Sequence, residues 1–286
     1  MSYLRDFTLK KNLPVESLSS SDRFSIFYHN IFKYPLTFSE LFRWSAKNVP
    51  EVPPRIGCKN GYYFIEGSEG LIYKRAVRKR YSQNKTKIAR KAAKLISLIP
   101  SIKMVGLTGS LAMENADKGG DIDLILITKN GKLWTSRIIV YTILKLFGFR
   151  LRSPLNSRQK DRLCLNIWLD ETDLGWRKKE RNFYTAHEIL QTIPLVDKKG
   201  TFERFLSENK WALDFWPNAA EIRITKNNSS YTKQRRLNLI ESLAYKAQLS
   251  YMKTKVTREI VKPTRAIFHP NDLSKEIIGK MPLTDI

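Results

Sequence analysis

The stretch that decides the fold is VGLTGSLAMENADKGGDIDLILIT, residues 105–128. Two apolar segments enclose a Gly109-Ser110 turn and a pair of aspartates, Asp121 and Asp123. Successive side chains of a strand alternate between its faces, so the two aspartates share one face. Because their neighbours are isoleucine and leucine, two adjacent carboxylates at a sheet edge are costly unless something neutralises them.

A divalent cation is the neutralising group that this pattern favours. Mg²⁺ prefers one or two carboxylates together with phosphate oxygens and water. Gly109 lets backbone amides approach a phosphate, and the Ser110 hydroxyl adds a donor where a helix is expected to begin. Binding a triphosphate on one side and a metal on the other is what nucleotidyl transfer requires. The alternative is a solvated pair of acids in a loop, which the apolar flanks argue against.

The surrounding pattern places this motif in a small sheet. IKMVGLTG and DIDLILIT are predicted as strands, GKLWTSRIIVYTILKLFGF as an amphipathic helix that ends at Gly148, and DRLCLNIWLDE as a third strand. The sequence therefore predicts an α+β protein, with a small mixed-sheet core flanked by helical N- and C-terminal regions.

Strand, Gly-Ser, ten residues, Asp-x-Asp and strand together resemble the signature of the DNA polymerase β-like nucleotidyltransferase superfamily. The resemblance covers roughly residues 100–172. It implies that Asp121 and Asp123 bind Mg²⁺ (or Mn²⁺), and that Gly109 and Ser110 hold the triphosphate of an NTP. The implied reaction is metal-dependent transfer of a nucleoside monophosphate to an acceptor that is a nucleic acid, a protein or a small molecule.

The third acidic position of that family departs from the pattern. Asn166 stands at this place in the third strand, and an amide offers a metal one oxygen but no charge and no basic group. Asp170 has the same strand parity and is the alternative third member of the site. A second hypothesis therefore stays open: a catalytically inactive nucleic-acid-binding protein on the same scaffold.

The charge of the chain points to a polyanionic partner. Lys and Arg number 51 against 27 Asp and Glu, a net charge of +24. Such an excess favours nucleic acid, although a basic solvated surface is the simpler alternative. Residues 74–94 contain ten basic residues and no acidic one. We expect a helix there whose charged face either follows the phosphates of RNA or DNA or is simply solvated.

Three regions follow from these patterns. Residues 1–84 are predicted as a winged-helix-like module with two helices within 22–46, the second opened by a capping box from Thr37 to Glu40. A proline-rich segment stands where the recognition helix belongs, which argues against groove reading. Residues 85–175 form the predicted nucleotidyltransferase core. Residues 176–286 are predicted as mainly helical, with a long helix over 235–261.

The remaining features bear on location and on secondary candidates. No apolar run reaches the ~18 residues of a membrane helix, and the first residues lack the apolar segment of a signal peptide. We expect a cytoplasmic protein without a membrane partner. Cys58 and Cys164 fit a reducing compartment and are too isolated to hold zinc alone. His187 and Glu188 could assist catalysis, but such a pair on a helix is more often a packing contact.

Overall fold

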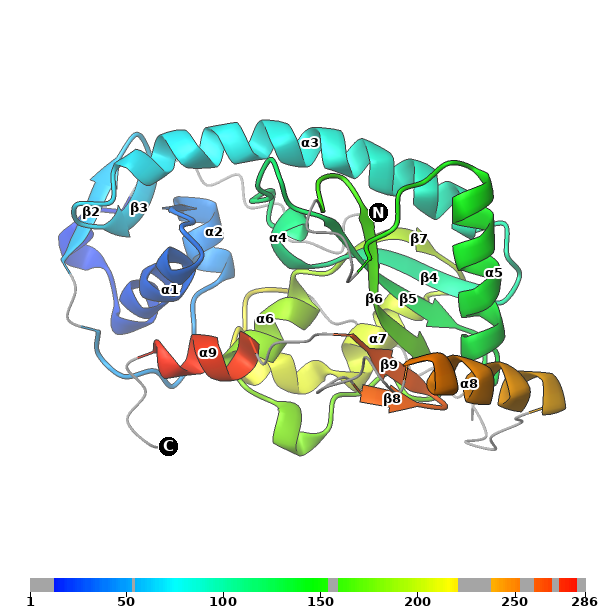
Figure 1. Ribbon diagram of the computed structural model, residues 1–286. Coiled ribbons are helices and arrows are strands. Elements are labelled where there is room, and N and C mark those ends of the chain that lie inside the picture. Colours follow the sequence, from blue (N-terminus) through cyan, green and yellow to red (C-terminus); the bar gives the residue numbers. More distant parts are fainter. Residues whose placement is uncertain are drawn as a thin grey trace.

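A computed structural model describes residues 13–52, 55–153, 159–220, 238–252, 260–268 and 273–281. It contains helices and two β-sheets (Figure 1), as expected for an α+β protein. The α-helices are α1 (Ser20–Ile31), α2 (Phe38–Arg43), α3 (Gly70–Ile96), α4 (Gly109–Ala112), α5 (Leu133–Leu146), α6 (Phe183–Leu190), α7 (Thr201–Glu208), α8 (Leu239–Met252) and α9 (Leu273–Gly279). The strands are β1 (Leu36–Thr37), β2 (Ile56–Lys59), β3 (Tyr62–Ile65), β4 (Ile102–Leu107), β5 (Ile122–Thr128), β6 (Leu163–Asp170), β7 (Ile193–Asp197), β8 (Ile260–Lys262) and β9 (Arg265–Ile267).

The N-terminal part packs α1 and α2 against a three-stranded sheet in the order β1-β3-β2. The predicted capping box is confirmed, since the Thr37 side chain accepts from the Glu40 amide and Glu40 accepts from the Thr37 amide. Residues 44–52, which follow α2, contain no helix. The two helices and β element expected of a winged-helix-like module are thus present, but the described residues show no third helix at this place.

Helix α3 joins the N-terminal part to the larger sheet. Its 27 residues form one continuous helix, which spans roughly 40 Å along the molecule (Figure 1). The expected boundary between residues 84 and 85 lies inside it. Near its start, Arg75 forms an ion pair with Glu40 at 2.6 Å. Further along, the buried Lys85 ammonium contacts Asp161 at 2.7 Å, so the same helix is anchored to both parts.

The larger sheet has six strands in the order β7-β4-β5-β6-β9-β8. Among the described strands of this sheet, β5 and β6 are the one parallel pair, so the sheet is mixed, as predicted. Three of its strands, β7, β8 and β9, lie in the region that was expected to be mainly helical. The prediction that a long helix extends to Ile260 and Val261 is wrong, because both residues lie in β8.

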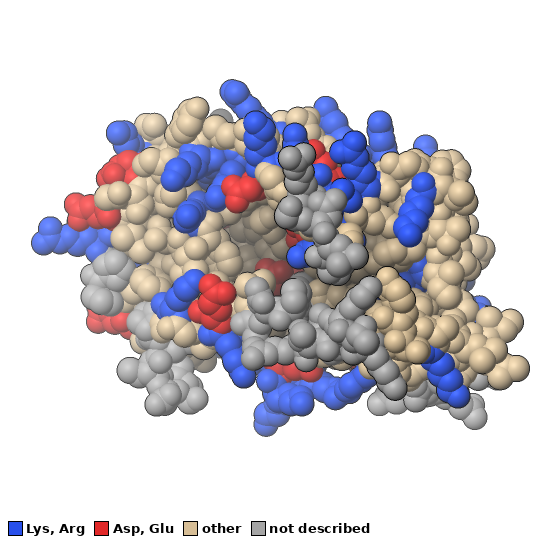
Figure 2. Space-filling model, viewed as in Figure 1, with Lys and Arg blue, Asp and Glu red and all other residues tan. Residues whose placement is uncertain are grey.

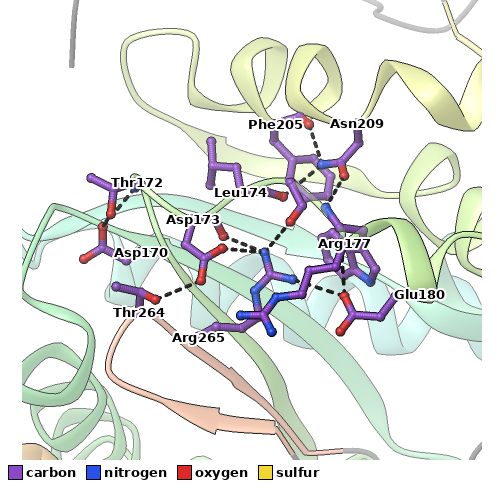
Figure 3. Close-up of polar contacts among 12 residues, drawn as sticks. Asp170, Thr172, Asp173, Leu174, Arg177, Glu180, Phe205, Asn209, Thr264 and Arg265 are labelled. Carbon is purple, nitrogen blue, oxygen red and sulfur yellow. Dashed lines mark hydrogen bonds and ion pairs between the residues drawn. The ribbon is translucent and has the colours of Figure 1, made fainter. Parts of the chain in front are cut away.

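A buried arginine fixes β9 to the segment that follows β6 (Figure 3). Arg265 is 1% exposed, and its Nη2 donates to the Asp173 carboxylate at 2.9 Å and to the Gly175 carbonyl at 2.6 Å. The Trp176 ring lies 5.1 Å from the guanidinium carbon. A buried cation is tolerated only with such partners. Strand β6 is therefore an interior strand, held between β5 and β9.

Alternation along β5 decides which way the aspartates point. Leu124 and Leu126 belong to the hydrophobic cluster that includes buried residues of α3 and α5. Ile125 and Ile127 belong to the opposite cluster, which includes residues of α1 and α6. Asp123 has the parity of Ile125, so it faces the side of the sheet covered by α6 and the N-terminal part. No helix within the described ranges is both long and apolar enough to cross a membrane.

Candidate active site

Asp121 and Asp123 lie at the start of β5, where β6 runs beside it. Asp123 is the strand partner of Cys164. The register shifts between Leu124 and the next residue of β5, and Asn166 is the extra residue on β6. Its Nδ2 donates to Asp123 Oδ1 at 2.9 Å. The structure thus brings Asn166 to the acid pair, as the sequence pattern predicts.

The Gly109-Ser110 turn lies directly against Asp123. Gly109 has φ +62°, which favours glycine, and a Cβ placed on it would be 2.9 Å from Asp123 Oδ2. Any side chain at this position would therefore push against the carboxylate. Ser110 is exposed, at the beginning of the short α4. The two halves of the motif, ten residues apart in sequence, are adjacent in space.

The Gly-Ser turn, the two aspartates and Asn166 line one cavity of about 380 Å³, whose lining does not include Cys164. Figure 2 shows the hollow in the middle of the molecular face, with acidic side chains in its depth. Gly109, Ser110, Asp121, Asp123 and Asn166 all contribute to its lining. The opposite walls come from α6 and from the N-terminal part; they include His29, Phe32, Tyr34, Tyr184, His187 and Glu188. Its volume is within the range of small-molecule sites.

Asp170 is not brought to this cavity. It pairs with Thr128 at the far end of β6, six residues from Cys164 and therefore roughly 20 Å from the acid pair. Its Oδ2 accepts from the Gly131 amide at 2.7 Å. Its Oδ1 accepts from the Thr172 hydroxyl at 2.7 Å, as Figure 3 shows. The carboxylate stabilises the turn after β6. Strand parity predicts on which face of the sheet the Asp170 side chain lies, but it does not predict how far along the strand Asp170 is from the two aspartates.

The two aspartates are electrostatically coupled. Burial and the charge of Asp121 raise the pKa of Asp123 to about 7. The thiol of Cys164 and the guanidinium of Arg152 act in the opposite direction. Arg152 Nη1 lies 3.1 Å from Asp121 Oδ2 and so offsets part of the negative charge. Asp123 is therefore protonated in part of the molecules near neutral pH, and a cation bound to the two aspartates could take the place of that proton.

Glu188 is a further acidic residue of this cavity, although the sequence favours a packing contact over a catalytic role for it. It lies on α6, and its carboxylate accepts hydrogen bonds from the Gly109 amide and from Gln191 Nε2. Burial and the charge of Asp123 raise its pKa to about 8. A His-Glu pair on a helix is usually a packing contact, and nothing local shows that α6 crosses the cavity.

His187, the neighbour of Glu188, makes a buried contact with α1. Its Nε2 lies 3.2 Å from His29 Nε2, and its ring centre lies 4.0 Å from that of Trp44. His29 Nδ1 donates to the Ser25 carbonyl at 2.8 Å, so His29 Nε2 accepts from His187. Burial lowers the pKa of both rings, that of His29 to about 4, so the pair is neutral. This contact joins two walls of the cavity.

The donor set of the site suits a divalent cation. One ligand atom each from Asp121, Asp123 and Cys164 lies within 4.8 Å of the others. Asn166 Oδ1 is buried and has no hydrogen-bond partner in the structure, although a buried amide oxygen usually has one. The parity argument that selects Asn166 selects Cys164 too, two residues earlier on the same strand.

No protein-family model, curated protein or solved structure matches this chain. The interpretation of the cavity therefore depends on the residues that line it.

Proposed function

We propose that the chain transfers a nucleoside monophosphate from an NTP to an acceptor hydroxyl or phosphate, with Mg²⁺ or Mn²⁺, in the cavity beside β5. One observation carries the proposal. The glycine of the Gly109-Ser110 turn packs against the Asp123 carboxylate, and both aspartates line the same cavity as the turn. The turn that we propose to bind phosphate and the acid pair that we propose to bind metal thus lie side by side.

Asp121 and Asp123 would hold the cation, and the residues around them fix their orientation. A cation bound there offsets the negative charge that develops on the transferred phosphoryl group. Arg152 holds Asp121 from one side. The Asn166 amide holds Asp123 from the other. Both contacts fix carboxylate rotamers before substrate arrives, which reduces the entropy lost on binding.

Glu188 is the residue that we assign to accept the proton of the acceptor. Asn166 cannot do so, because an amide is not a base at neutral pH. A pKa of about 8 suits proton transfer near neutral pH. Glu188 also lines a second, mainly apolar cavity of about 420 Å³, which shares Thr108, Ile167, Tyr184 and Leu273 with the first. An acceptor in that second cavity would meet Glu188 beside the acid pair.

The proposal is tested by labelling. The protein is incubated with each labelled NTP, Mg²⁺ or Mn²⁺, and separate pools of cellular RNA, protein and small molecules. We expect the parent to label one pool, and Asp121→Asn and Asp123→Asn to lower the rate by about 100-fold or more. The exposed Asp214 lies outside the cavity, so Asp214→Asn is the matched control. Equal labelling by the parent and Asp123→Asn contradicts the proposal.

One further observation favours a nucleic-acid partner, with or without catalysis. Of the ten basic residues in 74–94, four form ion pairs: Arg75, Arg78, Lys79 and Lys85, with Glu40, Asp117, Glu114 and Asp161 respectively. The basic stripe of α3, by contrast, is exposed and follows helical spacing; it consists of Lys87, Arg90, Lys91 and Lys94. Figure 2 shows basic side chains along the edge that α3 forms. We propose this stripe as the contact surface for RNA or DNA phosphates.

A further inference from the structure

The strand that carries Asn166 also brings a sulfur atom to the two aspartates. Cys164 is buried, and its Sγ lies within 4.8 Å of a carboxylate oxygen of both Asp121 and Asp123. Its thiol is hydrogen-bonded to Asp123. Arg152 Nη1 lies 3.4 Å from Sγ and 3.1 Å from Asp121 Oδ2. One guanidinium thus contacts both the sulfur and a carboxylate.

A second observation points to a ligand at the same place. The side-chain oxygen of Asn166 has no hydrogen-bond partner among the residues that the structure describes, although Asn166 is only 5% exposed. The same side chain lines the cavity and donates through Nδ2 to Asp123. A buried oxygen that is left unpaired lowers stability, and a bound cation would give this oxygen a partner.

We propose that Cys164 is a metal ligand, and that Asp121, Asp123 and Cys164, with Asn166 Oδ1, form a mixed oxygen–sulfur site for a soft or borderline divalent cation such as Zn²⁺. This inference rests on the proposed function, because it names the cation that the acid pair holds before nucleotide binds. Soft thiolate ligands favour such ions, whereas sites of oxygen alone suit Mg²⁺. The softer ion occupies the site before nucleotide binds, and the Mg²⁺ or Mn²⁺ of the proposed reaction is held by the same two aspartates together with the triphosphate.

The charges of this site balance. Sγ binds as the thiolate, and its proton passes to solvent. Two carboxylates and one thiolate carry three negative charges, which the cation and the Arg152 guanidinium together neutralise. A partly buried cluster without net charge avoids the desolvation cost of an uncompensated ion. The position of Arg152, beside both Sγ and Asp121, is the one that such a balance requires.

The test is direct metal binding to the full chain without nucleotide. The chelator-treated protein is titrated with Cd²⁺, a spectroscopic substitute for Zn²⁺, and separately with Mg²⁺. We expect the parent to bind Cd²⁺ with an ultraviolet thiolate-to-metal charge-transfer band. Cys164→Ser should lose this band and about tenfold or more in Cd²⁺ affinity. Its Mg²⁺ affinity should change less than about threefold, because only the sulfur is removed.

Cys58, exposed and distant in sequence, supplies the matched control. Cys58→Ser should keep both the band and the affinity. A band that persists in Cys164→Ser and disappears in Cys58→Ser overturns the inference, as does an unchanged Cd²⁺ affinity in Cys164→Ser. A parent that binds neither cation, with or without NTP, overturns the proposed function as well. In the parent, bound Cd²⁺ should protect Cys164 from alkylation, whereas Mg²⁺ should not. This measurement does not depend on a variant that folds.

Discussion

The Asp123 carboxylate destabilises the metal-free protein at high pH. Its pKa is raised from the ordinary 3.8 to about 7, first by burial and then by Asp121. The folded state therefore holds a proton that the unfolded state has released, and stability is lost as pH rises through about 7. The proposed function of this site would therefore come at a cost in stability, as is common for active sites.

Asp123→Asn should stabilise the metal-free protein at pH 8.5, and less than half as much at pH 5, which lies nearer to the unfolded pKa of 3.8 than to the folded pKa of about 7. The gain should be about 2 kcal/mol, below the full value of the shift because the side chain is partly exposed. Thermal unfolding at the two pH values, with Asp214→Asn as the control, measures it. A gain of equal size at both pH values would show that Asp123 is not the cause.

Glu188→Gln should separate binding from proton transfer. If Glu188 takes the acceptor's proton, kcat falls by about 100-fold or more, whereas KM for the NTP stays within about threefold. The parent's rate should rise with pH toward about 8, where Glu188 becomes ionised, and the variant should lose this rise. Steady-state kinetics from pH 6 to 9 decide the matter, with the exposed Glu208→Gln as control. An unchanged pH profile removes Glu188 from the mechanism.

The His29–His187 contact should make the protein sensitive to acid. Burial lowers the pKa of His29 from 6.5 to about 4, so the unfolded state binds more protons than the folded state between these values. Stability is therefore full above pH 6.5 and falls by roughly 3 kcal/mol as pH drops to 4. Glu188 and Asp123 act in the opposite sense, because their folded pKa values are raised.

A double variant separates the contribution of the two histidines to the pH dependence of stability from that of Asp123 and Glu188. His29→Gln with His187→Gln should be less stable than the parent at pH 7, because the buried contact is lost. It should also lose less stability between pH 7 and pH 5. Urea unfolding at both pH values gives the two differences. Parallel losses in parent and variant would contradict the assignment of acid sensitivity to this pair.

Among the secondary elements, α3 carries two kinds of basic residue that the sequence does not distinguish. Arg78 forms an ion pair with Asp117, and Lys79 one with Glu114, so neither is purely a surface charge. The basic stripe of α3, by contrast, has no ion pair within the described part of the chain. A phosphate track along α3 would therefore use the second half of the helix.

Replacing Lys87, Arg90, Lys91 and Lys94 by Gln should weaken RNA or DNA binding and flatten its salt dependence. Each phosphate contact contributes about −0.7 to −0.9 to the slope of log K against log salt, so the slope should change by about three. Sequence preference should hardly change, because phosphate contacts carry no base information. Filter binding at several salt concentrations measures the slope. Four exposed lysines elsewhere, Lys129, Lys145, Lys178 and Lys210, form the control set. Equal slopes for both sets would leave α3 as a solvated surface.

Long apolar segments were the most predictable elements. Strands β4 and β5 and helix α5 have clear periodicity, and their positions follow from the sequence. Strands β8 and β9 have three residues each, and β9 pairs with β6, about one hundred residues away in sequence. Such short strands are stabilised by pairing rather than by local preference. The position of Glu188 in the cavity is hard to predict for a similar reason, since it depends on where α6 packs.

At the scale of the whole molecule, the core is not a separable unit. The sheet takes β7, β8 and β9 from beyond residue 175, and α3 crosses the expected boundary at 84. We expect a fragment of residues 85–175 to show no cooperative thermal transition by circular dichroism, whereas the full chain does. A cooperative transition in that fragment, with a melting temperature near that of the full chain, would contradict this expectation. The fragment also lacks Glu188 and the N-terminal wall of the cavity.

The pairing of β6 with β9 has a consequence for the order of synthesis. Strand β6, which carries Cys164 and Asn166, ends at residue 170, whereas β9 ends at residue 267. A ribosome that adds 5–20 residues per second needs roughly 5–20 s to cover this distance. During this interval one edge of β6 remains open, and an open edge can pair with another chain. Slowing translation between these two points should therefore increase aggregation of the nascent protein, and chaperones that cover strand edges should be needed most in that interval.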